Sequence, residues 1–312
     1  MIQIKKDVLL SNFSNYKIGG PARLFVEVGS VEELKETLRL AKSLAQGKIA
    51  ILGGGTNLLI ADSGFDGLVI HNKIGGIERI GNDLRVGSGV MVKDLLSFCI
   101  ENSLSGLEWA GGLPGTVGGA VWGNAGAFGG EIKDSVSEVR SLDIVACQEK
   151  TKANRECNFG YRSSVFKNGE RKEEFITSVT FSLKGGKKEE IQKAIQEKID
   201  YRNNKHPMNY PNIGSIFKNI SFESLAPTLK EEFRQYVKND PFPVVPTAKI
   251  IFLAGLKGKR IGGAMVSQKH TNFIVNFDNA KAEDVKHLIA LEKKVIKDKF
   301  GITIEEEIIY LG

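Results

Sequence analysis

Apolar residues recur along the chain with two different periods, which separate predicted helices from predicted strands. A spacing of three to four residues follows Ser30, and Ser30 forms a capping-box pattern with Glu33, so a helix is expected from this point. Helices are also expected over residues 92–101 and 188–203. Short apolar runs between turn residues predict strands within 48–55, 58–60, 67–70 and 77–89. The apolar positions of the first helix are Leu34, Leu38, Ala41 and Ala45.

The second half of the chain continues this mixture. Short β segments are expected over 131–183, and a change of composition at 184–188 indicates a domain boundary. A late apolar stripe predicts a helix that Asp278 or Asn279 caps and Gly301 ends, followed by a strand over 302–312. We therefore predict an α+β N-terminal domain over 1–186 and a smaller α+β domain over 187–312. The stripe consists of Val285, Leu288, Ile289, Val295 and Ile296.

Glycine is concentrated in two segments, 53–57 and 111–130, within a span that holds 20 of the 35 glycines. Residues 53–57 join two predicted strands, so the dinucleotide-binding fingerprint of a strand followed by a helix does not apply. Successive backbone N–H groups and one asparagine could surround a pyrophosphate there. The second segment predicts a binding loop that lies flat against a planar ring. Tight turns are the alternative interpretation of both segments.

Composition limits the class of protein. The chain has 312 residues, of which 41% are hydrophobic and 26% are charged, as is typical of a globular protein of about two domains. No run approaches the roughly 20 apolar residues of a membrane span, and no secretory signal is recognised at the N-terminus, so we expect a cytoplasmic protein. The three cysteines and four histidines form no metal-ligand motif, so no metal is expected.

The net charge of +6 is unevenly distributed, with −2 over residues 1–150 and +8 over residues 151–312. Basic residues in the second half are interleaved with acidic ones and form no aromatic-studded stripe, so a nucleic-acid partner is not expected. A small phosphorylated ligand fits this balance. A solvated, lysine-rich surface fits it equally well.

Six characteristic segments follow one another along the chain. They are IGGPA (18–22), LGGGTNLLI (52–60), GLPGTVGGAVWGNAGAFGGEI (112–132), FGYRSSVFK (159–167), GSIFKN (214–219) and a glutamate-rich end. Each is a weak signal alone, but their order is specific. Together they resemble the UDP-N-acetylenolpyruvoylglucosamine reductases, the MurB family, and the resemblance extends from about Asn12 to Gly312.

The resemblance implies an FAD-binding domain of the vanillyl-alcohol-oxidase (PCMH) type, followed by a smaller α+β substrate domain. It implies an oxidoreductase that uses FAD and NADPH to convert UDP-N-acetylglucosamine enolpyruvate to UDP-N-acetylmuramate in peptidoglycan synthesis. The short connection after Leu183 resembles the compact type of the family, which lacks the long substrate-covering loop. Tyr201, Arg202 and His206 are candidates to cover the ligand instead. A monomer is expected.

By the same resemblance, Arg162, Ser215 and Glu307 carry the reaction. Hydride passes from reduced FAD to the terminal alkene carbon, while the guanidinium of Arg162 binds the substrate carboxylate as a bidentate fork. Ser215 then protonates the internal carbon, and Lys218 is a candidate cation to favour the serine alkoxide. Glu307 can help only in its protonated form. Glu305 is the alternative, because it lies one pleat period away and points to the same face of the predicted strand.

The resemblance also implies the ligand-binding residues. The substrate is expected to contact Tyr161, Lys218, Asn219, Gln268 and His270. The FAD is expected to contact Ile18, Gly19, Gly53, Gly54, Gly55, Thr56, Asn57, Gly112, Pro114, Gly115, Thr116, Gly118, Gly119, Asn124, Ala125 and Gly126.

Two other functions remain open. An oxidase or dehydrogenase on the same fold is expected to anchor its flavin covalently through histidine or cysteine. The only histidine of the predicted N-terminal domain, His71, lies outside both glycine-rich segments. A non-catalytic flavin-binding or nucleotide-sugar-binding protein is expected to lack Arg162, Ser215 or the terminal glutamate, and all three are present.

Overall fold

The computed structural model describes residues 2–44, 48–168 and 174–312 and divides into two compact units. Unit 1 consists of residues 1–8, 22–54 and 66–201, and unit 2 of residues 9–21, 55–65 and 202–312. The division differs from the predicted domains, 1–186 and 187–312, because two short N-terminal segments group with the C-terminal half and residues 187–201 group with unit 1. Each unit is described by itself.

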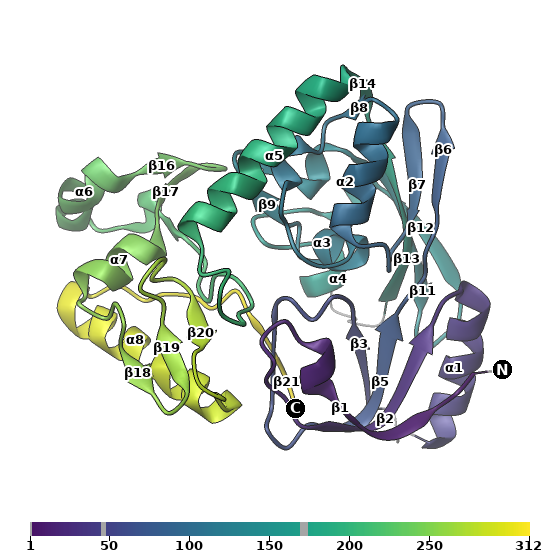
Figure 1. Cartoon of the computed structure of the whole chain (residues 1–312), viewed down its shortest axis with the longest axis horizontal. Helices are drawn as coiled ribbons and strands as arrows, with labels where there is room; N and C mark the ends of the chain where they lie inside the picture. Colours follow the sequence, from purple (N-terminus) through teal and green to yellow (C-terminus); the bar gives the residue numbers. More distant parts are fainter. Residues whose placement is uncertain (1, 45–47, 169–173) are drawn as a thin grey trace. The chain divides into compact units, whose positions relative to one another are not determined.

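Unit 1 contains a four-stranded sheet in the order β1-β2-β5-β3, in which β3 and β5 are parallel (Figure 1). The helix α1 packs its leucines against this sheet, in a core that includes Leu24 and Val26 of β2 and Ile70 of β5. The apolar period after Ser30 therefore faces the sheet as predicted, and the Ser30 Oγ accepts a hydrogen bond from the Glu33 N–H at 3.1 Å. The elements are β1 (Lys5–Leu9), β2 (Pro21–Val28), α1 (Val31–Leu44), β3 (Ile49–Leu52) and β5 (Phe65–Asn72).

A five-stranded antiparallel sheet in the order β12-β11-β13-β7-β6 forms the rest of unit 1, together with two small antiparallel strand pairs, β9–β10 and β8–β14. Residues of α2, α3 and α5 share one hydrophobic core with this sheet (Figure 1). The strands are β6 (Ile77–Ile80), β7 (Asp83–Gly87), β8 (Leu104–Ser105), β9 (Gly126–Ala127), β10 (Gly130–Glu131), β11 (Val136–Asp143), β12 (Glu149–Ala153), β13 (Glu174–Ser182) and β14 (Lys184–Gly185), and the helices are α2 (Val92–Glu101), α3 (Val117–Trp122), α4 (Val165–Asn168) and α5 (Lys188–Lys205).

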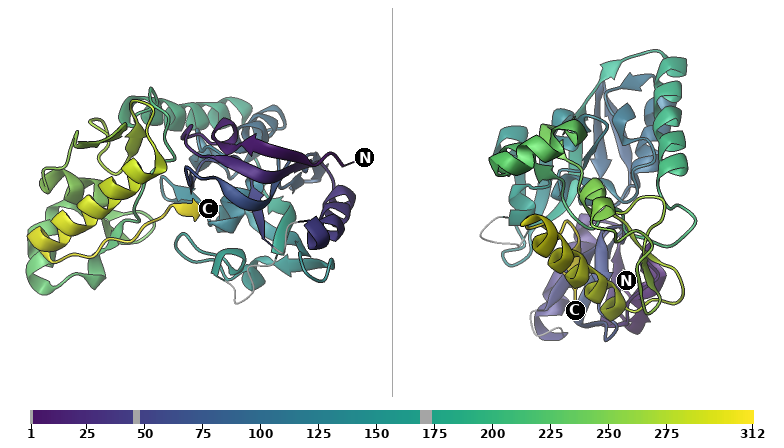
Figure 2. Two further views of the ribbon diagram at one scale, coloured as in Figure 1. Left: turned by 90° about the horizontal axis from the view of Figure 1, so that it is seen from below. Right: turned by 90° about the vertical axis from the view of Figure 1, so that its left-hand side faces the viewer.

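Unit 2 has three small sheets, in the orders β15-β17-β16, β18-β19-β20 and β21-β4. The longest helix of the unit, α8, packs against β18 and β19, and is the long yellow helix in Figure 2. The elements are β4 (Leu58–Ile60), β15 (Ile220–Ser221), α6 (Pro227–Phe233), β16 (Lys238–Asn239), β17 (Pro243–Val245), α7 (Thr247–Leu253), β18 (Arg260–Ile261), β19 (Ala264–Val266), β20 (Ile274–Asn276), α8 (Ala282–Phe300) and β21 (Ile309–Leu311).

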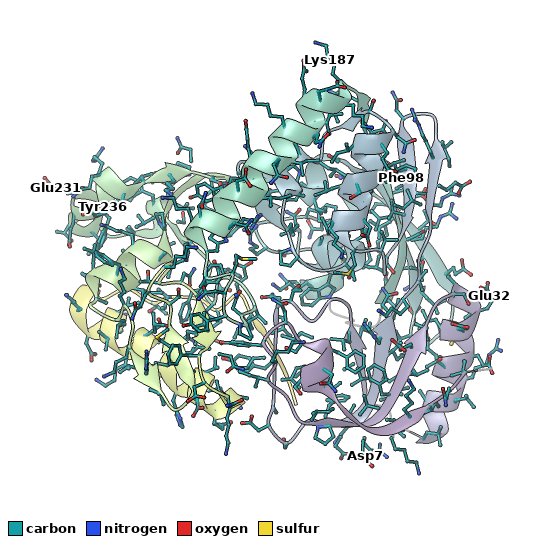
Figure 3. All side chains as sticks on the ribbon, in the orientation of Figure 1. Asp7, Glu32, Phe98, Lys187, Glu231 and Tyr236 are labelled. Carbon is teal, nitrogen blue, oxygen red and sulfur yellow. The ribbon has the colours of Figure 1, made fainter. Side chains whose placement is uncertain are left out.

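The helices predicted from apolar periodicity are confirmed. Helix α2 has the predicted bounds and buries Leu95, Leu96 and Cys99, while Phe98, labelled in Figure 3, is only half-buried. Helix α5 matches the predicted 188–203, and α8 buries most of the predicted stripe. Ala45, the last predicted position of the first helix, lies outside the described residues.

Two predicted helix and strand limits are wrong. The cap of α8 is neither Asp278 nor Asn279, because the helix begins at Ala282 and the carboxylate of Asp62 accepts hydrogen bonds from its first two N–H groups, at 2.9 and 3.3 Å. The predicted strand 302–312 is reduced to β21, because residues 305–307 pair with the chain around Phe217. A distant acid thus replaces a local cap.

Helix α8 also carries a buried carboxyl group. Glu292 is 1% exposed, and neither of its oxygens has a hydrogen-bond partner among the described residues. Burial raises the pKa of Glu292 well above its usual value, since the charged form is poorly solvated there. The same core holds Tyr16, which is fully buried and donates its hydroxyl to the Ile274 carbonyl at 2.8 Å. A neutral carboxyl group at this position leaves its hydrogen-bonding capacity unused.

We expect Glu292→Met to stabilise the protein by about 1–3 kcal/mol, since a partnerless polar group is replaced by an apolar one of similar length. The folded-state pKa is raised, so the natural protein loses stability as the pH rises above the unfolded value of about 4.3. The gain should therefore be larger at pH 8 than at pH 5, as measured by thermal unfolding. Glu283→Met is the control, because Glu283 is exposed and its pKa is lowered by Lys286. An equal gain at both pH values would contradict the assignment.

Candidate active site

The two glycine-rich segments contact each other within unit 1. A Cβ added to Gly53 would lie 2.7 Å from Oγ1 of Thr116, and one added to Gly54 would lie 2.7 Å from Cα of Gly115. Real Cβ atoms do not approach other atoms this closely, so both positions require glycine. We call Gly53, Gly54, Gly115 and Thr116 the glycine junction. It brings the predicted pyrophosphate segment and the predicted flavin segment together in one place.

The second glycine-rich segment is only partly the loop that its composition predicts. Residues 117–122 form α3, whose N-cap Thr116 accepts a hydrogen bond from Gly119 at 3.3 Å. The N–H groups of Val117 and Gly118 donate to the carbonyls of Val90 and Ser88. The first three N–H groups of the helix are thus engaged within the protein. Exposed Gly119 therefore allows close approach of a ligand but offers it no N–H donor, while Gly118 is buried against Ser88.

Part of the predicted FAD set lies in unit 2. Gly19 has a φ of +137°, and a Cβ there would lie 2.8 Å from the Ile60 side chain. Gly55 has a φ of +61°, which glycine adopts without strain. The side-chain Nδ2 of Asn57 donates a hydrogen bond to the Glu307 carbonyl at 3.1 Å, and the backbone carbonyl of Asn57 accepts one from the Ile309 N–H. This segment therefore holds the chain on both sides of the terminal acid.

Arg162 lies in a tight turn of unit 1, in which Gly160 and Ser163 exchange two backbone hydrogen bonds. Its φ of +54° is rare for a residue with a side chain, and strain of this kind clusters at functional sites. The guanidinium donates from Nη2 to the Gly126 carbonyl at 2.8 Å and lies 5.1 Å from the ring centroid of Tyr161. The turn therefore presents the arginine in one fixed direction, next to the second glycine-rich segment.

Ser215 follows Gly214, whose φ is +84°, in a segment of unit 2 that asparagines hold on both sides. The Asn212 Oδ1 accepts from the Gly214 N–H, and the Asn272 side chain bonds both the N–H and the carbonyl of Phe217. Ser215 itself is half-buried. Its hydroxyl forms no hydrogen bond within the described ranges of the chain, so its proton is not committed to a neighbour.

The three terminal glutamates have different surroundings in unit 2. Glu305 is largely exposed and accepts a 2.5 Å hydrogen bond from Lys218 Nζ. Glu306 pairs with Lys293 and accepts a hydrogen bond from the Tyr310 hydroxyl. Glu307 is half-buried, and its N–H donates to the carbonyl of Ile216, next to Ser215.

These contacts favour Glu307 over Glu305 as the residue near Ser215. They also give Lys218 an acidic partner, so its charge is compensated and its predicted effect on a serine alkoxide is weakened. Among the other predicted substrate residues, Asn219 accepts a hydrogen bond from the Thr247 N–H.

The predicted substrate residue His270 lies in an aromatic cluster with His206 and Phe273, and the sequence did not predict these ring contacts. Its ring is 5.2 Å from that of His206 and 4.8 Å from that of Phe273, measured between centroids. Burial lowers the pKa of His270 to about 4, and burial together with the neighbouring positive groups lowers the pKa of His206 to about 4. Both rings are therefore neutral near pH 7 and act as donors or acceptors without charge. Gln268 lies next to Gly258.

Several residues that fix these segments could not be recognised as such from the sequence. Asn212, Asn272 and Lys167 hold the predicted catalytic residues in place, and Lys167 does so by donating Nζ to the Arg162 carbonyl at 3.0 Å. Asparagine and lysine are common at surfaces, so only their hydrogen bonds distinguish them. In the described part of the chain, no group of three or more potential metal ligands occurs, and no helix is long and apolar enough to cross a membrane.

Comparison with known proteins identifies the family that this chain resembles. Residues 206–311 match the sequence model of the UDP-N-acetylenolpyruvoylglucosamine reductase C-terminal domain, and residues 22–152 match that of an FAD-binding domain. A UDP-N-acetylenolpyruvoylglucosamine reductase of Anoxybacillus flavithermus is 37% identical over 99% of this chain and 94% of its own length. That of Caldicellulosiruptor bescii is 39% identical over 100% of this chain and 91% of its own.

The chain belongs to the UDP-N-acetylenolpyruvoylglucosamine reductase family. The crystal structure of a member from Thermus caldophilus has a TM-score of 0.79 to this chain, with 29% identity and full coverage of both chains. The family resemblance and the α+β fold class, with an FAD-binding domain first, are therefore confirmed, and the protein is an oxidoreductase. The assignments of individual residues stay predictions.

The close contact at the glycine junction can be tested by substitution. Gly54→Ala places a methyl group against the Gly115 backbone, and we expect a loss of about 1–3 kcal/mol in unfolding free energy from overpacking. Gly185→Ala is the matched control, because Gly185 is exposed and no atom lies within 4 Å of an added Cβ. Thermal unfolding compares the two variants. If Gly54→Ala unfolds at the same temperature as the control, the junction tolerates a side chain and the close contact is not a requirement.

Proposed function

We propose that the protein reduces UDP-N-acetylglucosamine enolpyruvate to UDP-N-acetylmuramate, a step of peptidoglycan synthesis, with FAD as cofactor and NADPH as reductant. The observation that carries this proposal is the presence of Arg162, Ser215 and Glu307, each fixed by hydrogen bonds of its own segment, in a chain of this family. A monomer and a cytoplasmic location, expected from the sequence, stay predictions.

The residues of unit 1 fit a flavin. Gly112 and Gly119 are exposed, so a planar ring could approach their backbone without meeting a side chain. The glycine junction holds the first glycine-rich segment against the second one. The FAD-binding residues in this unit would then be Gly53, Gly54, Gly112, Pro114, Gly115, Thr116, Gly118, Gly119, Ala125 and Gly126, while Ile18, Gly19, Gly55, Thr56 and Asn57 are the proposed contacts from unit 2. Bound FAD, once reduced by NADPH, would supply hydride to the terminal alkene carbon of the substrate.

Arg162 supplies the electrostatic part of catalysis in this proposal. Hydride addition to the terminal carbon builds negative charge on the internal carbon and the attached carboxylate. A guanidinium held in one direction stabilises that charge without having to reorganise during the reaction. The Gly126 carbonyl and the Tyr161 ring hold the side chain of Arg162 in this way.

Ser215 supplies the proton in this proposal. An alcohol is a weak acid, so it can protonate only a strongly basic centre, which the internal carbon becomes after hydride addition. The hydroxyl of Ser215 is not engaged elsewhere among the described residues, so it is available to donate. Glu307, whose N–H binds the neighbouring Ile216 carbonyl, would contribute only as a neutral acid, since a carboxylate would repel the developing charge.

The proposed substrate-binding residues are Tyr161, Lys218, Asn219, Gln268 and His270. Lys218 Nζ donates one hydrogen bond to Glu305, and an ammonium group has three donors, so it can also contact a phosphate. Neutral His270 suits a hydrogen bond to an uncharged part of a nucleotide sugar.

Ser215→Ala separates the two halves of the proposed reaction. Under anaerobic conditions, we expect NADPH to bleach the flavin absorbance of this variant as fast as that of the natural protein. Return of the absorbance on adding the enolpyruvyl sugar should slow by about 10²–10⁴, the range for loss of a general acid. Ser215→Cys, which keeps a proton donor, should recover part of this rate. Equal slowing of both halves, or return only with oxygen, would overturn the proposal.

Glu305→Gln and Glu307→Gln test which terminal acid acts. We expect Glu307→Gln to lower kcat by about 100-fold. Glu305→Gln should change kcat by less than about fivefold, because an exposed ion pair contributes at most about 1 kcal/mol. Steady-state rates measured across pH compare the two variants. Equal losses of kcat would mean that Glu307 has no special role.

A further inference from the structure

Asn124 is a buried polar residue whose side chain is used entirely inside unit 1. It is 0% exposed and adopts a φ of +42°, a conformation that asparagine tolerates better than most residues. Its Nδ2 donates to the Gly160 carbonyl at 2.9 Å and to Oε1 of Glu131 at 3.3 Å, and its Oδ1 accepts from the Lys133 N–H at 3.1 Å. Both donors of the amide and its oxygen are therefore engaged within the protein, and the side chain is fully buried.

Glu131 completes this group. Its side chain is 4% exposed, and its second oxygen pairs with Lys133 Nζ at 2.5 Å, so the charge is compensated. Its backbone lies opposite Gly126 in the β9–β10 pair, and the Gly126 carbonyl accepts the hydrogen bond from the Arg162 guanidinium. One hydrogen-bond network therefore supports Arg162 at two points. Asn124 holds the turn that contains its backbone, and Glu131 lies opposite Gly126, whose carbonyl binds the guanidinium.

The Arg162 turn needs such support. A left-handed conformation costs a residue with a side chain roughly 1–2 kcal/mol, and it persists only where the surroundings impose it. The bond from Asn124 to the Gly160 carbonyl fixes the first residue of the turn, and Ser164, just after it, is fixed by a 2.7 Å bond to the Trp122 carbonyl. Asn124 is the one of these anchors that also connects to the strand under the guanidinium.

We propose that Asn124 and Glu131 are positioning residues for Arg162, which set the direction of its guanidinium toward the substrate carboxylate. Asn124 then acts through the arginine and not as a contact of FAD, in contrast to its assignment by resemblance. The inference rests on the proposed function, because it takes Arg162 as the group that binds the carboxylate.

Asn124→Asp is the sharpest variant, because it keeps the shape and the acceptor of the side chain but removes the donors. The new carboxylate would repel both the Gly160 carbonyl and Glu131. We expect kcat/KM for the enolpyruvyl sugar to fall by about 100-fold, the effect of a displacement of about 1 Å, because Arg162 both binds the carboxylate and stabilises the charge that develops on it. The affinity for FAD, measured by titrating the flavin-free protein, should stay unchanged. Adding Glu131→Gln removes the repulsion between the two acids and should recover part of the loss.

A readout without substrate or cofactor comes from amide hydrogen exchange at Ser163, whose N–H donates to the Gly160 carbonyl across the turn. In flavin-free protein, Asn124→Asp should speed exchange at Ser163, and Glu131→Gln in the same chain should slow it again. Asn102→Asp is the matched control, since Asn102 also donates Nδ2 to a backbone carbonyl, that of Phe98, but lies at the end of α2. It should lower thermal stability without affecting Ser163 or kcat/KM.

The outcomes separate the proposals. A weaker affinity for FAD with an unchanged kcat/KM at saturating FAD would make Asn124 a cofactor ligand and overturn the inference. A loss of thermal stability alone, as in the control, would make it a structural residue and also overturn it. If Arg162→Lys leaves kcat/KM unchanged, the proposed function of the arginine is wrong. In that case, the rate of amide hydrogen exchange at Ser163 in Asn124→Asp still shows whether Asn124 holds the turn.

Discussion

The contact between two glycine-bearing backbones, Gly53–Gly54 and Gly115–Thr116, is the constraint on which the rest of unit 1 depends. It sets where β3 ends and where α3 begins, because Thr116 is both part of the contact and the N-cap of that helix. The Gly115 carbonyl accepts from Val92, which starts α2. The starts of two helices and the end of one strand are thus fixed at one contact, which a side chain on Gly53 or Gly54 would disrupt.

Much of this fold follows from local patterns in the sequence. Apolar periodicity is sufficient for α1, α2, α5 and α8, since each lies on a hydrophobic core with a regular stripe. It fails for α3, where two glycines lower the helix propensity and the helix depends on its cap and on burial of Val117 and Val121. The cap of α8 comes from Asp62, and no local pattern can reveal a partner so far along the chain.

The candidate site shows the same division. Motif order identifies Arg162, Ser215 and Glu307, because these residue types recur in fixed sequence contexts. It does not reveal the left-handed backbone of Arg162, which depends on bonds to several separate segments. Nor does it reveal that Lys218 pairs with Glu305. The sequence makes both residues candidates for a role in the reaction, whereas the structure places them in an exposed ion pair. Sequence patterns specify which groups are present, and the hydrogen bonds decide which of them are available.

The pairing of β21 with β4 has a consequence for synthesis of the chain on the ribosome. Strand β4 lies early in the sequence, and the hydrogen bond between Asn57 and Glu307 joins residues 250 positions apart. At about 5–20 residues per second, translation leaves residues 55–65 without their final strand partner for roughly 12–50 s. An unpaired strand edge is a template for unwanted association, so this short apolar segment needs protection until its partner strand is made.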